Sequence, residues 1–257
     1  MVMFNKSRVA LAAAGAVAAT MMSMAPAHAA TLMKFGDFSE VGNGANVRWV
    51  KNNTGGSLFT IATPTGTTLG NAKVKFNFDL PYLADLNNLA ANYRMSVTAP
   101  AGSAALNGGL GFFTQPNLQG SFSFIYTGPN TIIDGFAVNT GANLLSATFF
   151  NDAAIQGRVK GTAGTMFAST DTGSVIHYTS DFIDFKHSYI RDFSNSLNAV
   201  KPTFGYTSGK ALNSFTASDV GEFGVAIPEP ATWATTILGF GLLGATLRRR
   251  RSAAATA

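Results

Sequence analysis

Hydrophobic and polar residues alternate with a period of two along much of the chain. In the segment 73–79, Val74, Phe76 and Phe78 face one way, and the intervening Lys, Asn and Asp residues face the other. Such alternation is typical of a strand that buries one face and exposes the other. The pattern predicts further strands at residues 48–50, 58–62, 93–98, 121–127, 132–138, 144–150, 154–160, 175–178, 182–185 and 213–217.

Turn-forming sequences separate these segments. Clusters of Asn, Thr, Gly and Pro occupy residues 52–56, 107–109, 128–130, 140–141 and 172–173. The segment 81–92 has leucines spaced for a short helix, but it equally fits a loop or the entry to a strand. Many short strands joined by polar turns predict an all-β body, best described as an antiparallel β-sandwich, with a jelly-roll-like fold or a barrel as the alternative.

The N-terminus has the three parts of a secretory signal. Lys6 and Arg8 form a positive start, 9–22 is a nearly unbroken apolar run, and Ala27-His28-Ala29 supplies the small residues of a signal-peptidase site. The pattern predicts a signal helix within residues 1–29 and cleavage before Ala30. A buried N-terminal helix or a retained anchor is the alternative.

The C-terminus predicts a second targeting segment. Prolines at 228 and 230 interrupt the preceding structure, and residues 231–247 carry no charge. A helix of this length spans roughly 25 Å, somewhat less than a hydrocarbon core of about 30 Å. Trp233 stands near one end, and Arg248, Arg249, Arg250 and Arg251 follow the other. The positive-inside rule keeps such an arginine cluster in the cytoplasm, so we expect a membrane helix stopped there with the body on the far side.

The order of these features resembles the PEP-CTERM sorting signal, in its PEPxxWA variant. The motif residues are Pro228, Glu229, Pro230, Trp233 and Ala234, followed by a glycine-rich apolar segment and the arginine cluster. The resemblance implies an exported protein of Gram-negative bacteria and cleavage near the motif by an exosortase-type transpeptidase. It also implies a passage through the inner membrane, an outer-envelope or extracellular destination, and an association with exopolysaccharide and biofilm.

Charge and cysteine content narrow the function of the body. Six of the 18 Lys and Arg residues lie in the two targeting segments, and the 12 that remain between residues 30 and 226 are balanced by 12 acidic residues. A body without net charge gives no support to nucleic-acid binding. The absence of Cys excludes disulfides, thiol catalysis and Cys-ligated zinc. We therefore divide the chain into a signal peptide (1–29), a β-body (30–226) and a sorting tail (227–257).

Two short motifs resemble a dinucleotide-binding fingerprint and a catalytic signature, but both lack the required context. Residues 239–244 spell GxGxxG inside the predicted membrane helix, where no strand or acidic partner accompanies them. Residues 171–174 spell the Asp-Thr-Gly-Ser of aspartic proteases. That chemistry needs two such carboxylates, and no second Asp-Thr-Gly or Asp-Ser-Gly occurs in the sequence. We interpret the latter as a turn between two strands in which Gly173 has a positive φ angle.

Polar residues of the body offer a few further candidates. His177 and His187, with Asp181 and Asp184 between them, could hold a metal or form an acid–base pair, but we favour ordinary structural roles for both histidines. The alternative ligand is a Ca²⁺ ion held by carboxylates such as Asp134, Asp152, Asp181 and Asp184, although their spacing is not diagnostic. We expect no metal and no other cofactor.

Three functions remain open for the body. The first is a non-enzymatic structural or interaction protein of the envelope or matrix. The second is a secreted carbohydrate-binding module, for which Trp49 is the candidate stacking residue because it is the only Trp of the body. The third is a secreted hydrolase, which would need two carboxylates at a defined separation. We expect the first and predict no catalytic residue.

Overall fold

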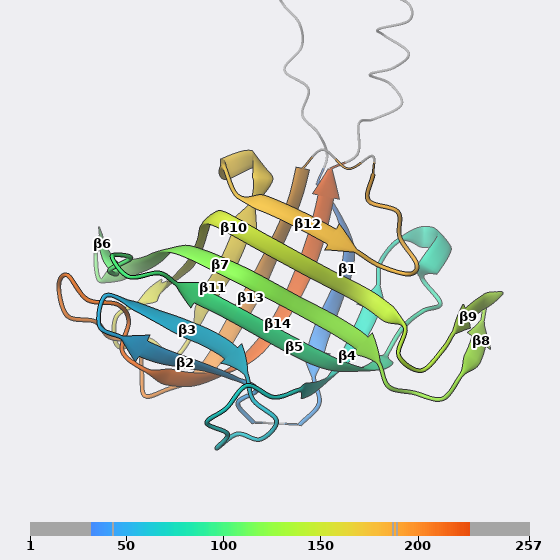
Figure 1. Cartoon of the computed structure of the whole chain (residues 1–257), viewed down its shortest axis with the longest axis horizontal. Helices are drawn as coiled ribbons and strands as arrows, with labels where there is room; N and C mark the ends of the chain where they lie inside the picture. Colours follow the sequence, from blue (N-terminus) through green and yellow to red (C-terminus); the bar gives the residue numbers. More distant parts are fainter. Residues whose placement is uncertain (1–31, 43, 187, 189, 227–257) are drawn as a thin grey trace, which may run out of the picture. The chain divides into compact units, whose positions relative to one another are not determined.

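The described part of the chain is built from strands, with two short 3-10 turns. The computed structural model describes residues 32–42, 44–186, 188 and 190–226 (Figure 1). The strands are β1 (Leu32–Glu40), β2 (Val47–Asn52), β3 (Gly55–Thr60), β4 (Ala72–Phe78), β5 (Leu89–Ala99), β6 (Leu106–Gly109), β7 (Phe112–Tyr126), β8 (Thr131–Ile133), β9 (Phe136–Val138), β10 (Asn143–Arg158), β11 (Gly164–Ser169), β12 (Val175–Thr179), β13 (Ile190–Lys201) and β14 (Phe215–Ala226). The 3-10 turns are η1 (Pro81–Leu83) and η2 (Thr170–Thr172). The prediction of an all-β fold is confirmed.

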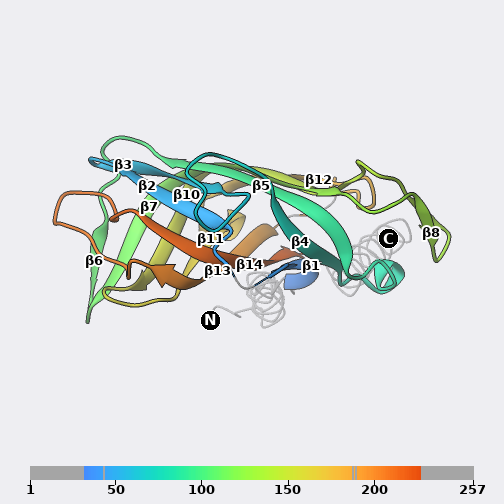
Figure 2. The ribbon, with the colours of Figure 1, turned by 90° about the horizontal axis from the view of Figure 1, so that it is seen from below.

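Twelve of these strands form one antiparallel sheet that closes on itself, and β8 and β9 form a separate hairpin. The closed circuit runs β1–β4–β5–β7–β10–β11–β13–β14 and returns to β1. Strands β2 and β3 bridge β14 and β5, while β6 and β12 extend from β7 and β10. Figures 1 and 2 show the circuit flattened into two layers, with β5, β7 and β10 in one and β1, β13 and β14 in the other. The fold therefore combines the predicted sandwich with the closure of the barrel alternative.

Aromatic side chains fill the space between the two layers. Tyr93 and Phe124, from β5 and β7, stack in parallel with ring centroids 4.7 Å apart. Phe38 of β1 lies 4.8 Å from each of these rings, and Phe223 of β14 lies 5.3 Å from Phe122. All five side chains are buried. Because large rings bury much apolar area each, this cluster is a main source of the stability of the β-domain.

Several strand predictions are wrong in extent. The two segments 144–150 and 154–160 belong largely to one strand, β10, which continues through a bulge at Asn151 and Asp152, whose φ angles are 61° and 47°. The segment 132–138 is the β8–β9 hairpin rather than a single strand, because Asp134 and Gly135 have positive φ angles and reverse the chain. Bulges and tight turns interrupt or reverse a strand without interrupting its apolar pattern.

Two other segments also differ from the predictions. Residues 182–185 form a loop in which the Ser180 hydroxyl accepts a hydrogen bond from the Phe182 N–H, so the backbone is held by a side chain instead of a ladder. Residues 81–92 contain only the turn η1 before β5 begins at Leu89.

The predicted signal helix within 1–29 and the membrane helix at 231–247 lie outside the described residues. Within the described ranges, no helix has the length and apolar character needed to cross a bilayer. The first and last described strands meet, because Leu32 of β1 is paired with Ala226 of β14. The β-domain thus begins and ends at adjacent positions of the same ladder.

Candidate functional site

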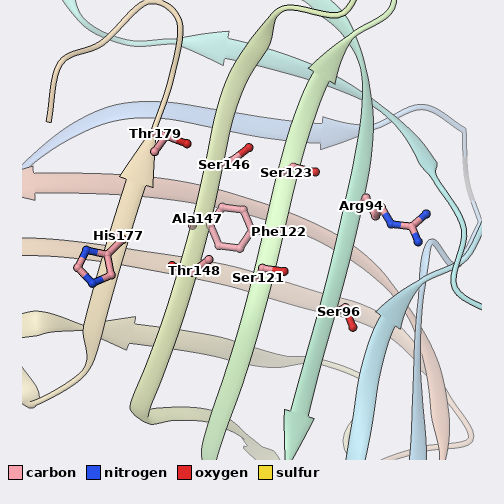
Figure 3. Close-up of a pocket in the computed structure, with 10 residues that line it drawn as sticks. All are labelled: Arg94, Ser96, Ser121, Phe122, Ser123, Ser146, Ala147, Thr148, His177 and Thr179. Atoms are coloured by element: carbon pink, nitrogen blue, oxygen red, sulfur yellow. The ribbon is translucent and has the colours of Figure 1, made fainter.

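The outward-facing positions of four adjacent strands form a polar surface on one layer. The register of β5, β7, β10 and β12 aligns these positions into two rows that cross all four strands. The first row is Ser96, Ser121, Thr148 and His177, and the second is Arg94, Ser123, Ser146 and Thr179. Figure 3 shows hydroxyl groups along the middle strands, with the guanidinium and the imidazole at opposite sides. Period-two alternation produces this surface, because the intervening residues of each strand point into the core.

The two rows line a shallow depression of about 320 Å³, whose floor includes the buried Phe122 and Ala147. The Ser146 hydroxyl donates a 2.7 Å hydrogen bond to Asn143 Oδ1, and Arg94 Nη1 lies 3.5 Å from Asn71 Oδ1. Within the described residues, the other serine hydroxyls, at 96, 121 and 123, form no hydrogen bond. They are therefore available to a ligand.

The chemistry of this depression favours binding by hydrogen bonds. Its lining includes one permanent cation, Arg94, and one exposed histidine, His177, but no carboxylate among the described residues. Phe150 is 41% exposed and its ring centroid lies 6.4 Å from that of His177, so an apolar ring stands beside the polar rows. This combination of hydroxyls, a guanidinium and a neighbouring aromatic ring suits a polyhydroxylated ligand, either neutral or anionic.

The prediction that Trp49 is a glycan-stacking residue is wrong. Its side chain is fully buried, its Nε1–H donates a 3.0 Å hydrogen bond to the Leu212 carbonyl, and its ring stacks on Phe215 at 6.4 Å. Gly56 lies so close that a Cβ there would be 2.3 Å from Trp49 Cζ2. The indole belongs to the core because Trp49 shares the buried face of β2 with Val47, which a single sequence does not reveal.

The structure does not assemble the acidic residues that were considered for calcium. Among the described residues, no group of three or more His, Asp or Glu side chains could hold a metal ion. Asp134 lies in the β8–β9 turn, and Asp152 lies in the bulge of β10. Asp181 Oδ2 accepts a 2.8 Å hydrogen bond from the Asn143 N–H, and Asp184 Oδ1 accepts one from the Lys186 N–H. His187, the proposed partner of His177, lies outside the described residues.

The Asp-Thr-Gly-Ser segment is the predicted turn. It forms η2 and the residues that follow, the Asp171 N–H donates to the Ser169 hydroxyl, and Gly173 has a φ angle of 106°. Asp171 is exposed, and the turn leads directly into β12.

Sequence reasoning missed a buried polar cluster around Asp219 of β14. Asp219 Oδ2 accepts hydrogen bonds from the Tyr93 hydroxyl at 2.7 Å and from Asn195 Nδ2 at 3.1 Å. Asn46 binds the backbone of Asp219 through its side-chain amide. Burial raises the pKa of Asp219 to about 7, against the lowering effect of the two side-chain hydrogen bonds. The signal was present in the alternation, because Asp219 shares its face of β14 with Phe215, Ala217 and Phe223.

These features define an all-β domain with a polar, carboxylate-free depression on its surface. Residues 226–251 match the PEP-CTERM protein-sorting motif, which confirms the resemblance drawn from the sequence. The match begins at the last residue of β14 and includes the Pro-Glu-Pro segment and the four arginines. It implies an exported chain that a membrane-associated exosortase processes. No curated protein and no solved structure matches the chain.

Proposed function

We propose that this chain is an exported, exosortase-sorted protein of non-enzymatic type whose β-domain acts in the outer envelope or the extracellular matrix. The observation that carries this proposal is the sorting motif at 226–251, which starts where β14 ends. Strand β14, which is paired with β1, β2 and β13, ends at Ala226. Cleavage near Pro228 therefore removes no described strand from the sheet. In this proposal signal peptidase cuts before Ala30, and the exosortase-type transpeptidase then acts while the tail crosses the inner membrane.

Sorting is tested by the intact mass of the protein recovered from each fraction of its host. We expect a species that begins at Ala30 and ends near Pro230, in the outer envelope or the medium. Deletion of Arg248–Arg251 should leave the precursor unprocessed or misplaced, because the positive cluster fixes the tail in the membrane. Deletion of 254–257, four uncharged residues, is the matched control. A wild-type species that still carries Arg251 in the inner membrane would contradict the proposal.

A carbohydrate-binding role is the second candidate, and the hydroxyl-lined depression favours it. The ligand in this proposal is an exopolysaccharide, held by Arg94 and the serine and threonine rows and stacked against Phe150. We propose binding in preference to hydrolysis, because glycoside cleavage requires two carboxylates and the described lining supplies none.

Binding is measured by affinity electrophoresis in gels that contain exopolysaccharide from the host. Arg94→Ala should weaken binding about ten- to a hundredfold, since a hydrogen bond to a charged group contributes about 1.5–3 kcal/mol. Ser121→Tyr should also weaken it by filling the depression. Lys73→Ala, which removes an exposed cation of β4, is the control. Equal retention of all four proteins would exclude the depression as the binding face.

A further inference from the structure

One end of the β-domain is formed by four segments that hydrogen bonds connect. The β6–β7 hairpin meets the β10–β11 turn where the Val159 N–H donates to the Gly111 carbonyl at 2.8 Å. The Ala105 N–H donates to the Lys210 carbonyl at 2.9 Å, and the Lys210 ammonium donates to Asn53 Oδ1 in the β2–β3 turn at 2.6 Å. We call this region, residues 50–60, 98–119, 154–168 and 197–217, the basic end. Figure 1 shows β6 and the β2–β3 turn on the same side of the domain.

The charged side chains of the basic end are all positive. Its four segments contain five cations and no Asp or Glu, although the body as a whole is neutral. The cations are Lys51, Arg158, Lys160, Lys201 and Lys210. Among the described residues, none of them forms an ion pair, since the three ion pairs there involve Lys34 and Lys186. The region therefore presents an uncompensated positive charge.

The same end carries exposed apolar side chains. Leu110, at the tip of the β6–β7 hairpin, is 92% exposed, and Leu106 and Phe112 on either side are 57% and 52% exposed. Leu110 also has a φ angle of 50°, a conformation that favours Gly or Asn. A leucine here neither packs into the core nor suits its own backbone. Folding therefore does not explain the exposure of this side chain.

We propose that the basic end binds peripherally to a phospholipid bilayer with anionic headgroups, and that the side chains of Leu106, Leu110 and Phe112 insert into it. Apolar groups that enter the acyl boundary, beside cations at the headgroups, are the general features of interfacial membrane binding. An anionic polysaccharide would use the cations but would leave Leu110 in water. The basic end includes the start of β14, where Thr216 pairs with Lys201. The sorting motif begins at Ala226, at the other end of this strand, so the proposal is independent of sorting.

The test uses the protein recovered from its host and a fluorophore at the hairpin tip. The chain has no Cys, so Leu110→Cys provides a unique site for an environment-sensitive nitrobenzoxadiazole label. Its emission should rise and shift to the blue with vesicles of equal parts phosphatidylglycerol and phosphatidylcholine, and much less with phosphatidylcholine alone. Ile132→Cys, on the β8–β9 hairpin beside Asp134, is the matched control: Ile132 is apolar and 75% exposed but lies outside the basic end. Its label should not respond, even if a retained tail anchors the protein to the vesicles.

Two unlabelled variants separate the apolar and the charged contributions. Leu110→Asn should keep the fold, because Asn suits a positive φ angle, and should weaken vesicle binding about tenfold through the loss of one buried leucine. Charge reversal with Arg158→Glu and Lys160→Glu should abolish the preference for phosphatidylglycerol. The proposal is wrong if the labels at 110 and 132 respond alike or if the label at 110 stays silent. If the label at 110 stays silent and the charge-reversed protein also loses affinity for alginate, an anionic polysaccharide, the basic end binds polysaccharide and not a bilayer.

Discussion

The buried carboxyl group of Asp219 makes the stability of the β-domain depend on pH. Its side chain is fully buried, its Oδ1 atom has no hydrogen-bond partner in the described structure, and its pKa is raised from 3.8 to about 7. At about 1.4 kcal/mol for each pKa unit, this difference corresponds to about 4 kcal/mol between the protonated and ionised forms. Asp219→Asn removes the ionisation and keeps a side chain of similar size.

The sign follows from which state holds the proton. Below pH 3.8 the carboxyl is protonated in both the folded and the unfolded chain, so it contributes no pH dependence. Between about pH 4 and pH 7 the unfolded chain loses this proton while the folded chain keeps it. The free energy of unfolding of the wild type therefore falls across this window by about 4 kcal/mol and is level above it.

The assay is urea unfolding of wild type and Asp219→Asn at a series of pH values from about 3 to about 8.5, a range that brackets the expected fall. Subtracting the two curves removes the contributions of the other titrating groups. We expect the free energy of unfolding of the variant to rise relative to that of the wild type as pH increases, and the difference between them to be constant above pH 8. A difference that does not change with pH, or one that moves in favour of the wild type, would refute the reasoning.

Three other substitutions, with one control, test further parts of the domain. Tyr93→Phe removes a hydrogen bond that lowers the pKa of Asp219, so the fall in stability should extend above pH 7 in the same urea series. Gly56→Ala places a Cβ 2.3 Å from the Trp49 ring and should cost about 1–3 kcal/mol in urea unfolding. Gly108→Ala, whose Cβ would meet Phe112 at an ordinary 3.4 Å, is its control and should change stability by less than about 1 kcal/mol. Trp49→Phe should lower stability by about 1–3 kcal/mol and leave any polysaccharide affinity of the folded protein unchanged, since the indole is buried and binds a backbone carbonyl; equal stability would contradict this account.

The alternating pattern predicted the all-β class and many strands, because burial of one face is a local property of a strand. It missed β1, β6, β11 and β13. In β1 a bulge between Lys34 and Gly36 shifts the register, and in β13 the buried Asn195 interrupts the apolar face. Both exceptions arise from contacts with strands that are distant in the sequence.

The candidate sites show the same division. The outward residues of β5 and β7, such as Arg94 and Ser121, were predictable one strand at a time. That β10 and β12 lie beside them, and so complete the two rows, depends on a strand order that periodicity does not contain. Trp49 illustrates the reverse: its chemistry suited a glycan, but its side chain is buried against Phe215 and bonded to the Leu212 carbonyl.

The pairing of Leu32 with Ala226 has a mechanical consequence. If the sorting tail is exchanged for a covalent link to the envelope, tension enters the domain at the end of β14. A load held at the other end of the molecule would then pull along β14, which is bonded to β13 on one side and to β1 and β2 on the other. Under such shear many ladder hydrogen bonds must break together, whereas peeling would break them one at a time. In that case β14, the last strand before the sorting motif, would resist extraction.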